Sequence, residues 1–76
     1  MNVYYYGLWK KMREWMEENG AKKAYYTIEE WAAEIKEPTL TPAKMGYMYR
    51  LGLVNKQQNR QYYGDSKNRY EPILNL

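Results

Sequence analysis

The residues best suited to chemistry in this sequence are basic side chains, and their excess lies in the second half of the chain. Residues 1–37 contain six Lys or Arg against seven Glu, a net charge of −1. Residues 38–76 contain six Lys or Arg against one Asp and one Glu, a net charge of +4. Positive charge gathered on one part of a small chain attracts anionic partners. The second half is therefore the part expected to bind such a partner.

The side chains that most enzymes and metal sites need are missing from the sequence. There is no Cys and no His, so the usual zinc ligands, a thiol nucleophile and the commonest general base are all lacking. A Gly-rich phosphate loop and a paired-carboxylate motif are also missing. We therefore expect a non-enzymatic protein with no metal or cofactor. The apolar runs are too short to span a bilayer and no signal peptide is visible, which favours a cytoplasmic protein.

The first two predicted helices follow from apolar spacing and from a helix-start motif. One covers residues 4–18, in which apolar side chains recur every three or four positions. The other covers residues 28–36 and begins at a capping box. In that motif the Thr27 hydroxyl accepts from the Glu30 amide, and the Glu30 carboxylate accepts from the Thr27 amide.

The third predicted helix covers residues 42–51. Thr41 is a favourable residue before a helix, Pro42 suits the first helical position, and Gly52 suits the position after the last. Gly46 lies inside this helix and costs about 1 kcal/mol relative to Ala. Either Gly46 lets another backbone approach closely or it has no role, and the sequence leaves both interpretations open.

The remaining segment, residues 53–74, predicts an antiparallel hairpin. Residues 64–68 form the best turn cluster in the chain, and a second candidate tip lies at residues 58–60. Residues 69–74 are the expected return strand. Pro72 indicates an edge strand, because Pro cannot donate to a neighbouring strand.

The segment YTIEEWAAEIK, followed later by RLGLV, resembles the winged helix-turn-helix family. The resemblance implies an α+β fold with three helices and a small antiparallel hairpin, the wing, in one domain over residues 1–76. Residues 24–26 would then form a small strand that pairs with the wing, or else a plain extended linker. The sequence departs from the family pattern in two ways: Lys36 stands where Gly commonly opens the turn, and the turn before Thr41 is longer than the pattern by a residue or two. Leu40 is expected to fill the space beneath this turn.

The resemblance also implies sequence-specific binding to double-stranded DNA, by a small regulator or accessory protein of a phage or mobile element. The third helix would enter the major groove, where Lys44 can donate to guanine and Thr41 and Tyr47 can bond bases or phosphates. Arg50 is better placed for phosphate, and Thr39 lies beside the helix start, which attracts phosphate. The wing would contact the DNA backbone or minor groove through Arg60, Lys67, Asn68 and Arg69.

Two other interpretations remain open. In the first, the basic side chains only keep one face of a helix and the hairpin solvated and have no binding role. Winged-helix domains also serve as protein-interaction modules, and a chain with 10 Tyr, 3 Trp and no Phe suits such a surface. Three consecutive Tyr at positions 4–6 cannot all face one core, so Tyr4 or Tyr6 is expected at the surface, in a weak homodimer or a partner contact.

The expected core contains apolar residues from every element: Leu8, Trp9, Met12, Trp31, Ile35, Met45, Met48, Leu53 and Tyr70.

Overall fold

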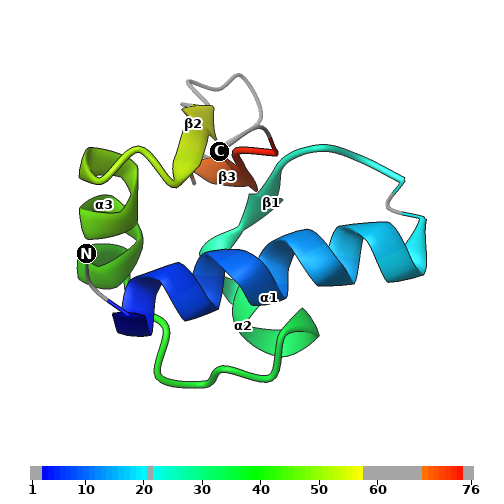
Figure 1. The fold of residues 1–76 in the computed structure, drawn as a ribbon, viewed down its shortest axis with the longest axis horizontal. Coiled ribbons are helices and arrows are strands. Elements are labelled where there is room, and N and C mark those ends of the chain that lie inside the picture. The colour runs from blue at the N-terminus through cyan, green and yellow to red at the C-terminus, as the bar shows by residue number, and fades with distance from the viewer. Residues whose placement is uncertain (1–2, 21, 58–67, 75–76) are drawn as a thin grey trace.

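Three helices and a three-stranded antiparallel sheet make up the described part of the chain (Figure 1). The computed structural model describes residues 3–20, 22–57 and 68–74. The elements in chain order are α1 (Val3–Asn19), β1 (Tyr26–Thr27), α2 (Ile28–Glu34), α3 (Pro42–Arg50), β2 (Val54–Gln57) and β3 (Arg69–Pro72). In Figure 1, α1 runs across the molecule, with α3 beside its first turns, the sheet above it and α2 below. The expected α+β class is confirmed.

The helix-start signals of the sequence operate as predicted. The Glu30 amide lies 3.2 Å from the Thr27 hydroxyl oxygen, and the Thr27 amide lies 2.8 Å from a Glu30 carboxylate oxygen, which completes the capping box. The Thr41 hydroxyl accepts from the Lys44 amide at 3.2 Å. Gly52 follows α3 with a φ of 79°, a left-handed conformation that suits Gly after a helix. Local sequence therefore defines where these helices begin and nearly where α3 ends, since its last helical residue is Arg50 and the predicted last residue, Leu51, caps it.

The second helix ends earlier than predicted. Its last helical residue is Glu34 and Ile35 caps it, whereas the expected end was Lys36. Lys36 has a φ of 57°, in the left-handed region that Gly adopts without a steric penalty. The backbone here thus keeps the conformation that a Gly would favour, although a Lys occupies the position.

One core joins all the elements, and all nine residues expected in it are buried. Trp31, Met12, Met45 and Met48 are completely inaccessible, each with an exposed fraction of 0%. Leu40 is buried under the turn between α2 and α3, as expected. The core also contains two apolar residues that were not expected there, Tyr26 and Val54.

Two tryptophans attach the helices to the last strand and to the residue that follows it. The Trp31 indole N–H of α2 donates to the Tyr70 carbonyl at 2.9 Å. The Trp9 indole N–H of α1 donates to the Ile73 carbonyl at 2.8 Å. Because a buried indole N–H needs an acceptor, these bonds define how α1 and α2 lie against β3.

The strand order corrects one prediction about Pro72. The order is β1-β3-β2, so β3 is the central strand and not an edge. β1 reaches only Arg69 and Tyr70, however, and Pro72 pairs with Val54 of β2 alone. Pro72 is thus tolerated in the central strand because β1 is too short to need a donor there.

The other hairpin predictions are met only in part. β3 ends at Pro72, two residues before the expected end of the return strand. The strand predicted at residues 24–26 is present but shifted: it covers only Tyr26–Thr27, and Tyr26 pairs with Tyr70. The predicted tip at residues 58–60 lies outside the described residues, as does the tip at 64–68 apart from Asn68.

Candidate nucleic-acid interface

The outward side of α3 is open. Met45 and Met48 point into the core and are inaccessible, so residues at spacings of three, four and seven on the opposite side face solvent. We call these residues the open face of α3: Ala43, Gly46, Tyr47 and Arg50. A Cβ added to Gly46 would meet no other atom within 4 Å. No described part of the chain therefore requires a close approach at Gly46, and that space is available to a partner.

Lys44 lies at one flank of the open face and not on it. Its ammonium donates to the Tyr4 hydroxyl at 3.1 Å and lies 5.3 Å from the centre of the Tyr4 ring. Beside it, the Tyr47 ring packs against the Tyr5 ring, with 4.8 Å between centroids. The predicted base-reading lysine is thus held against the first turn of α1.

A matching lysine lies at the other flank. The Lys56 ammonium of β2 lies 4.9 Å from the centre of the Tyr49 ring, which is 46% exposed. A cation over a Tyr ring face is attracted by the ring. Neither Tyr49 nor Lys56 was among the expected site residues. The spacing of these residues was a signal in the sequence. Tyr49 follows Gly46 by three residues, so it lies beside the open face of α3, and Lys56 follows Val54 by two residues, so both point to the same side of β2.

The two predicted threonines differ in their surroundings. Thr41 is exposed, and its hydroxyl already accepts from the Lys44 amide, which leaves its own proton for a ligand. The Thr39 hydroxyl lies 3.4 Å from a Glu37 carboxylate oxygen, and Glu37 pairs with Lys11 at 3.2 Å. A carboxylate therefore occupies the place where a phosphate was expected, which disfavours an anion at Thr39.

Two basic residues of the wing, Lys56 and Arg69, point to opposite faces of the sheet. Lys56 is paired with Tyr70 in register, so it faces the core side, towards α3. Arg69 is paired with Gln57 and Thr27, and successive residues of a strand point to opposite faces. Arg69 thus lies on the other face of the sheet. Asn68 lines a hollow near the start of α3, and Arg60 and Lys67 lie outside the described residues.

The second helix and its turn are acidic. Residues 28–40 contain four Glu and one Lys, a net charge of −3. The Thr27 amide, and then the Lys23 ammonium, hold the pKa of Glu30 below its usual value, so Glu30 is ionised at neutral pH. Two of these carboxylates are already paired, Glu30 with Lys23 at 2.9 Å and Glu37 with Lys11 at 3.2 Å, which weakens the repulsion of a phosphate on this side. The basic side chains of Arg50 and Lys56 lie outside this acidic segment, in the last turn of α3 and in β2.

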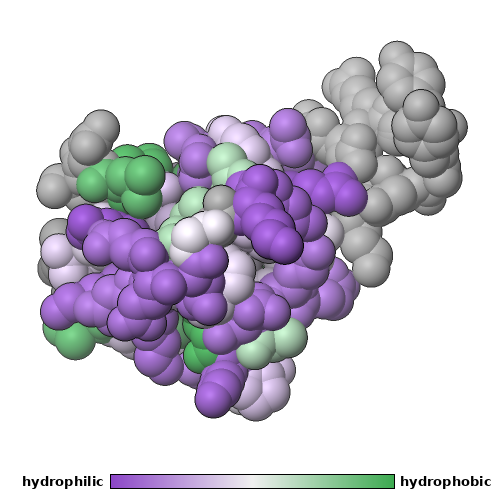
Figure 2. Space-filling model, turned by 90° about the vertical axis from the view of Figure 1, so that its right-hand side faces the viewer, coloured by the Kyte–Doolittle hydropathy of each residue, from purple (hydrophilic) through white to green (hydrophobic). Residues whose placement is uncertain are grey.

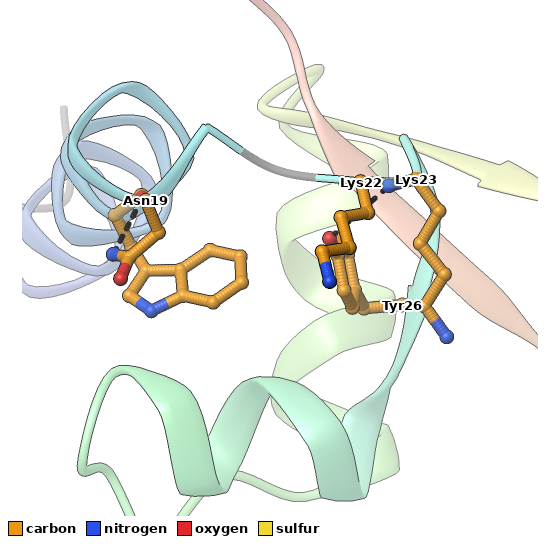
Figure 3. Close-up of a pocket in the computed structure, with 5 residues that line it drawn as sticks. Asn19, Lys22, Lys23 and Tyr26 are labelled. Carbon is orange, nitrogen blue, oxygen red and sulfur yellow. Dashed lines mark hydrogen bonds between the residues drawn. The ribbon is translucent and has the colours of Figure 1, made fainter.

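A hollow at the far end of α1 is a weaker candidate (Figure 3). It is lined by Trp15, Asn19, Lys22, Lys23 and Tyr26. The Asn19 amide donates to the Trp15 carbonyl, and the Lys23 ammonium donates to Glu30 at 2.9 Å. Several of its polar groups are thus already engaged, and the surrounding face is largely hydrophilic (Figure 2).

In residues 3–20, 22–57 and 68–74, no group of three or more His, Cys, Asp or Glu could hold a metal ion. None of the helices in these ranges is long and apolar enough to cross a membrane.

Comparison with protein-family models, with curated proteins and with solved structures found no match to this chain. The resemblance to winged helix-turn-helix domains therefore rests on the residues and element order of this chain alone.

Proposed function

We propose that this chain is a winged helix-turn-helix domain that binds double-stranded DNA without catalysis. The element order supports this proposal, because α2 and α3 form the helical pair and the β2–β3 hairpin takes the place of the wing. The observation that carries the proposal is the open face of α3, which has a lysine at each flank. Lys44 lies on Tyr4 at one side and Lys56 lies on Tyr49 at the other.

The geometry suggests a division of roles across this surface. Ala43 and Gly46 leave the helix backbone uncovered, so base edges can come close, and Ala can contact a thymine methyl group. Arg50, in the last turn of α3, and Lys56 are exposed or half-buried cations suited to phosphates. Lys44 can still donate its other N–H groups to a guanine. In this proposed arrangement the DNA lies closer to the wing than to α2.

The test is a salt titration of binding to a fluorescent random duplex, followed by anisotropy. The variant Arg50→Glu/Lys56→Glu should bind much more weakly, and the slope of log K against log salt should become shallower by about 0.9 for each phosphate that it no longer neutralises. Lys10→Glu/Lys22→Glu is the matched control, since it changes the charge equally at exposed positions away from α3. Equal affinities of the two variants at every salt concentration would reject this surface as the DNA site.

A second candidate, binding to protein, is favoured by exposed apolar side chains at the start of α1. Val3 is 83% exposed, Tyr4 45% and Tyr6 37%. We propose a weak self-association or partner contact there. Sedimentation of Tyr6→Ser against the unchanged protein tests self-association, because Tyr6 does not hold Lys44. Identical monomeric behaviour at high concentration would argue against a homodimer through this ring.

A further inference from the structure

The middle of the open face of α3 has no polar side chain. Ala43 is exposed and ends in a single methyl group, and Gly46 follows it three residues later. A Cβ added to Gly46 would meet no atom within 4 Å. We call these two residues the apolar strip of α3. In Figure 1, α3 lies at one edge of the molecule, so the strip can be reached from outside.

The polar residues next to the apolar strip are directed away from it. The Lys44 ammonium donates to the Tyr4 hydroxyl at 3.1 Å, and the Tyr47 ring packs against the Tyr5 ring, with 4.8 Å between centroids. Both contacts hold these side chains towards the start of α1. Arg50 lies in the last turn of α3. The side chains of the strip itself therefore offer contact to an apolar group and no hydrogen bond.

The cations around the apolar strip are open to phosphates. Three basic side chains elsewhere are each paired with a glutamate: Lys11, Arg13 and Lys23. Within the described residues, Lys44, Arg50 and Lys56 have no carboxylate partner. Since phosphate contacts fix the register of a protein on a duplex, these cations would hold the strip against the base edges between the two DNA backbones.

The chemistry of the major groove determines which base suits an apolar surface. All four base pairs present hydrogen-bond donors and acceptors there, and thymine also presents an apolar group, its C5 methyl. A side chain without a donor or acceptor can gain free energy from that methyl group by excluding water from it. Against any other base it would cover polar atoms without bonding to them, which costs free energy. The strip therefore favours thymine.

We infer that the apolar strip of α3 selects a thymine: the Ala43 methyl group contacts the thymine methyl group, and the open space over Gly46 accommodates it. The inference rests on the proposed function, because it concerns the same DNA surface, and it adds the base that this surface selects. Sites with a T·A pair opposite the strip should bind more tightly than sites with another pair there. Lys44 and Arg50 keep their proposed contacts beside that pair.

The test uses the unchanged protein and chemically modified DNA. A duplex site is selected from random sequences, and each of its thymines is replaced in turn by uracil, which pairs in the same way and lacks only the methyl group. Fluorescence anisotropy should show about fourfold weaker binding at one or two positions, the value for one buried methyl group. At the same positions, a 5-methylcytosine·G pair should bind more tightly than a C·G pair, because it restores the methyl group.

Variants then assign the effect to Ala43. Ala43→Gly removes the contacting methyl group, so the thymine and uracil duplexes should bind this variant equally at one of the sensitive positions. Ala43→Ser, which replaces that contact with a hydroxyl, should also lose the preference. Ala33→Gly is the matched control, since it makes the same substitution at an exposed helical position in α2. It should keep the fourfold difference, and circular dichroism shows whether each variant is folded.

Two results would overturn the inference alone. The affinity could stay the same with uracil in place of every thymine, or the uracil effect could persist in full at every position in Ala43→Gly and Ala43→Ser. In both cases, salt-dependent binding that Arg50→Glu/Lys56→Glu weakens would leave the proposed function intact. If the protein bound no duplex, or if that charge reversal had no effect, the proposed function would be rejected and the inference with it.

Discussion

Lys44 of α3 donates a hydrogen bond to the phenol oxygen of Tyr4 on α1, with 3.1 Å between the two atoms. The contact joins the predicted recognition helix to the first turn of a helix 40 residues earlier in the chain. A Lys ammonium has three N–H groups, so the bond leaves others available while it restricts the direction of the side chain. The orientation of Lys44 is therefore set by Tyr4.

If Lys44 reads a base, Tyr4→Phe should relax base preference without unfolding the protein. The ring stays in place and only the hydroxyl is removed, and an exposed hydrogen bond of this kind changes the unfolding free energy by no more than about 0.5 kcal/mol. Lys44→Ala should relax the preference further. The effect is measured by comparing the affinity for a duplex site selected from random sequences with the affinities for single-base variants of that site. Unchanged discrimination in Lys44→Ala would show that Lys44 does not read bases.

Gly46→Ala should stabilise the protein by about 1 kcal/mol, because the added methyl group meets no atom and a helix favours Ala over Gly. Gly7→Ala in α1 is the matched control, since its Cβ also meets no atom within 4 Å. Urea denaturation should show similar gains for both. If DNA approaches α3 closely, only Gly46→Ala should weaken duplex binding. Equal binding by the two variants would leave Gly46 without a functional role.

Lys36→Gly should stabilise the fold by about 1 kcal/mol, since Lys36 adopts a φ of 57° that costs an L-residue free energy and Gly little. Lys36→Val should act in the opposite direction, because a β-branched side chain fits this conformation poorly. The midpoints of thermal unfolding give the comparison. Destabilisation by Lys36→Gly would show that the turn does not have this conformation.

The capping box should make stability fall in acid. The pKa of Glu30 is lowered chiefly by the Thr27 amide, so its charged form is favoured in the folded protein. The stabilisation is present above the ordinary pKa of 4.5 and is lost as the pH falls through the lowered value. Glu30→Ala should cost about 1 kcal/mol at pH 7, and the difference from the unchanged protein should shrink below pH 4.5.

Glu34→Ala is the control for this measurement, because Glu34 is exposed on the same helix and lies outside the capping box. It should change the free energy of unfolding at pH 7 by less than about 0.5 kcal/mol. A Glu30→Ala deficit that stayed constant from pH 7 to strongly acidic conditions would mean that the carboxylate charge plays no part.

The sequence was sufficient for the features that depend on neighbouring residues. Thr27 and Glu30 are three residues apart, so their capping box could be read directly, and the spacing of Met45 and Met48 identified the buried side of α3. Contacts and positions that depend on residues far apart in the sequence could not be predicted. The contact of Lys44 with Tyr4 requires the packing of α3 on α1, and the place of Lys56 requires the register of β2 with β3.

Backbone strain and open surfaces were also beyond prediction. Nothing in the residue type of Lys36 indicates a left-handed conformation. The sequence also left open whether another backbone packs closely against Gly46, and only the structure shows that a Cβ there would meet no described neighbour within 4 Å.

The two indole bonds, to β3 and to the residue after it, have a consequence for how the protein is made. Trp9 donates to a carbonyl 64 residues later in the chain, and Trp31 to one 39 residues later. A ribosome synthesises both tryptophans long before it reaches Tyr70 and Ile73. Until those residues leave the exit tunnel, the nascent chain can form helical turns, but neither indole bond can form and Tyr70 cannot complete the core. Folding is therefore delayed until β3 has been translated, and a ribosome stalled before that strand would hold a chain whose tryptophans are still exposed to water.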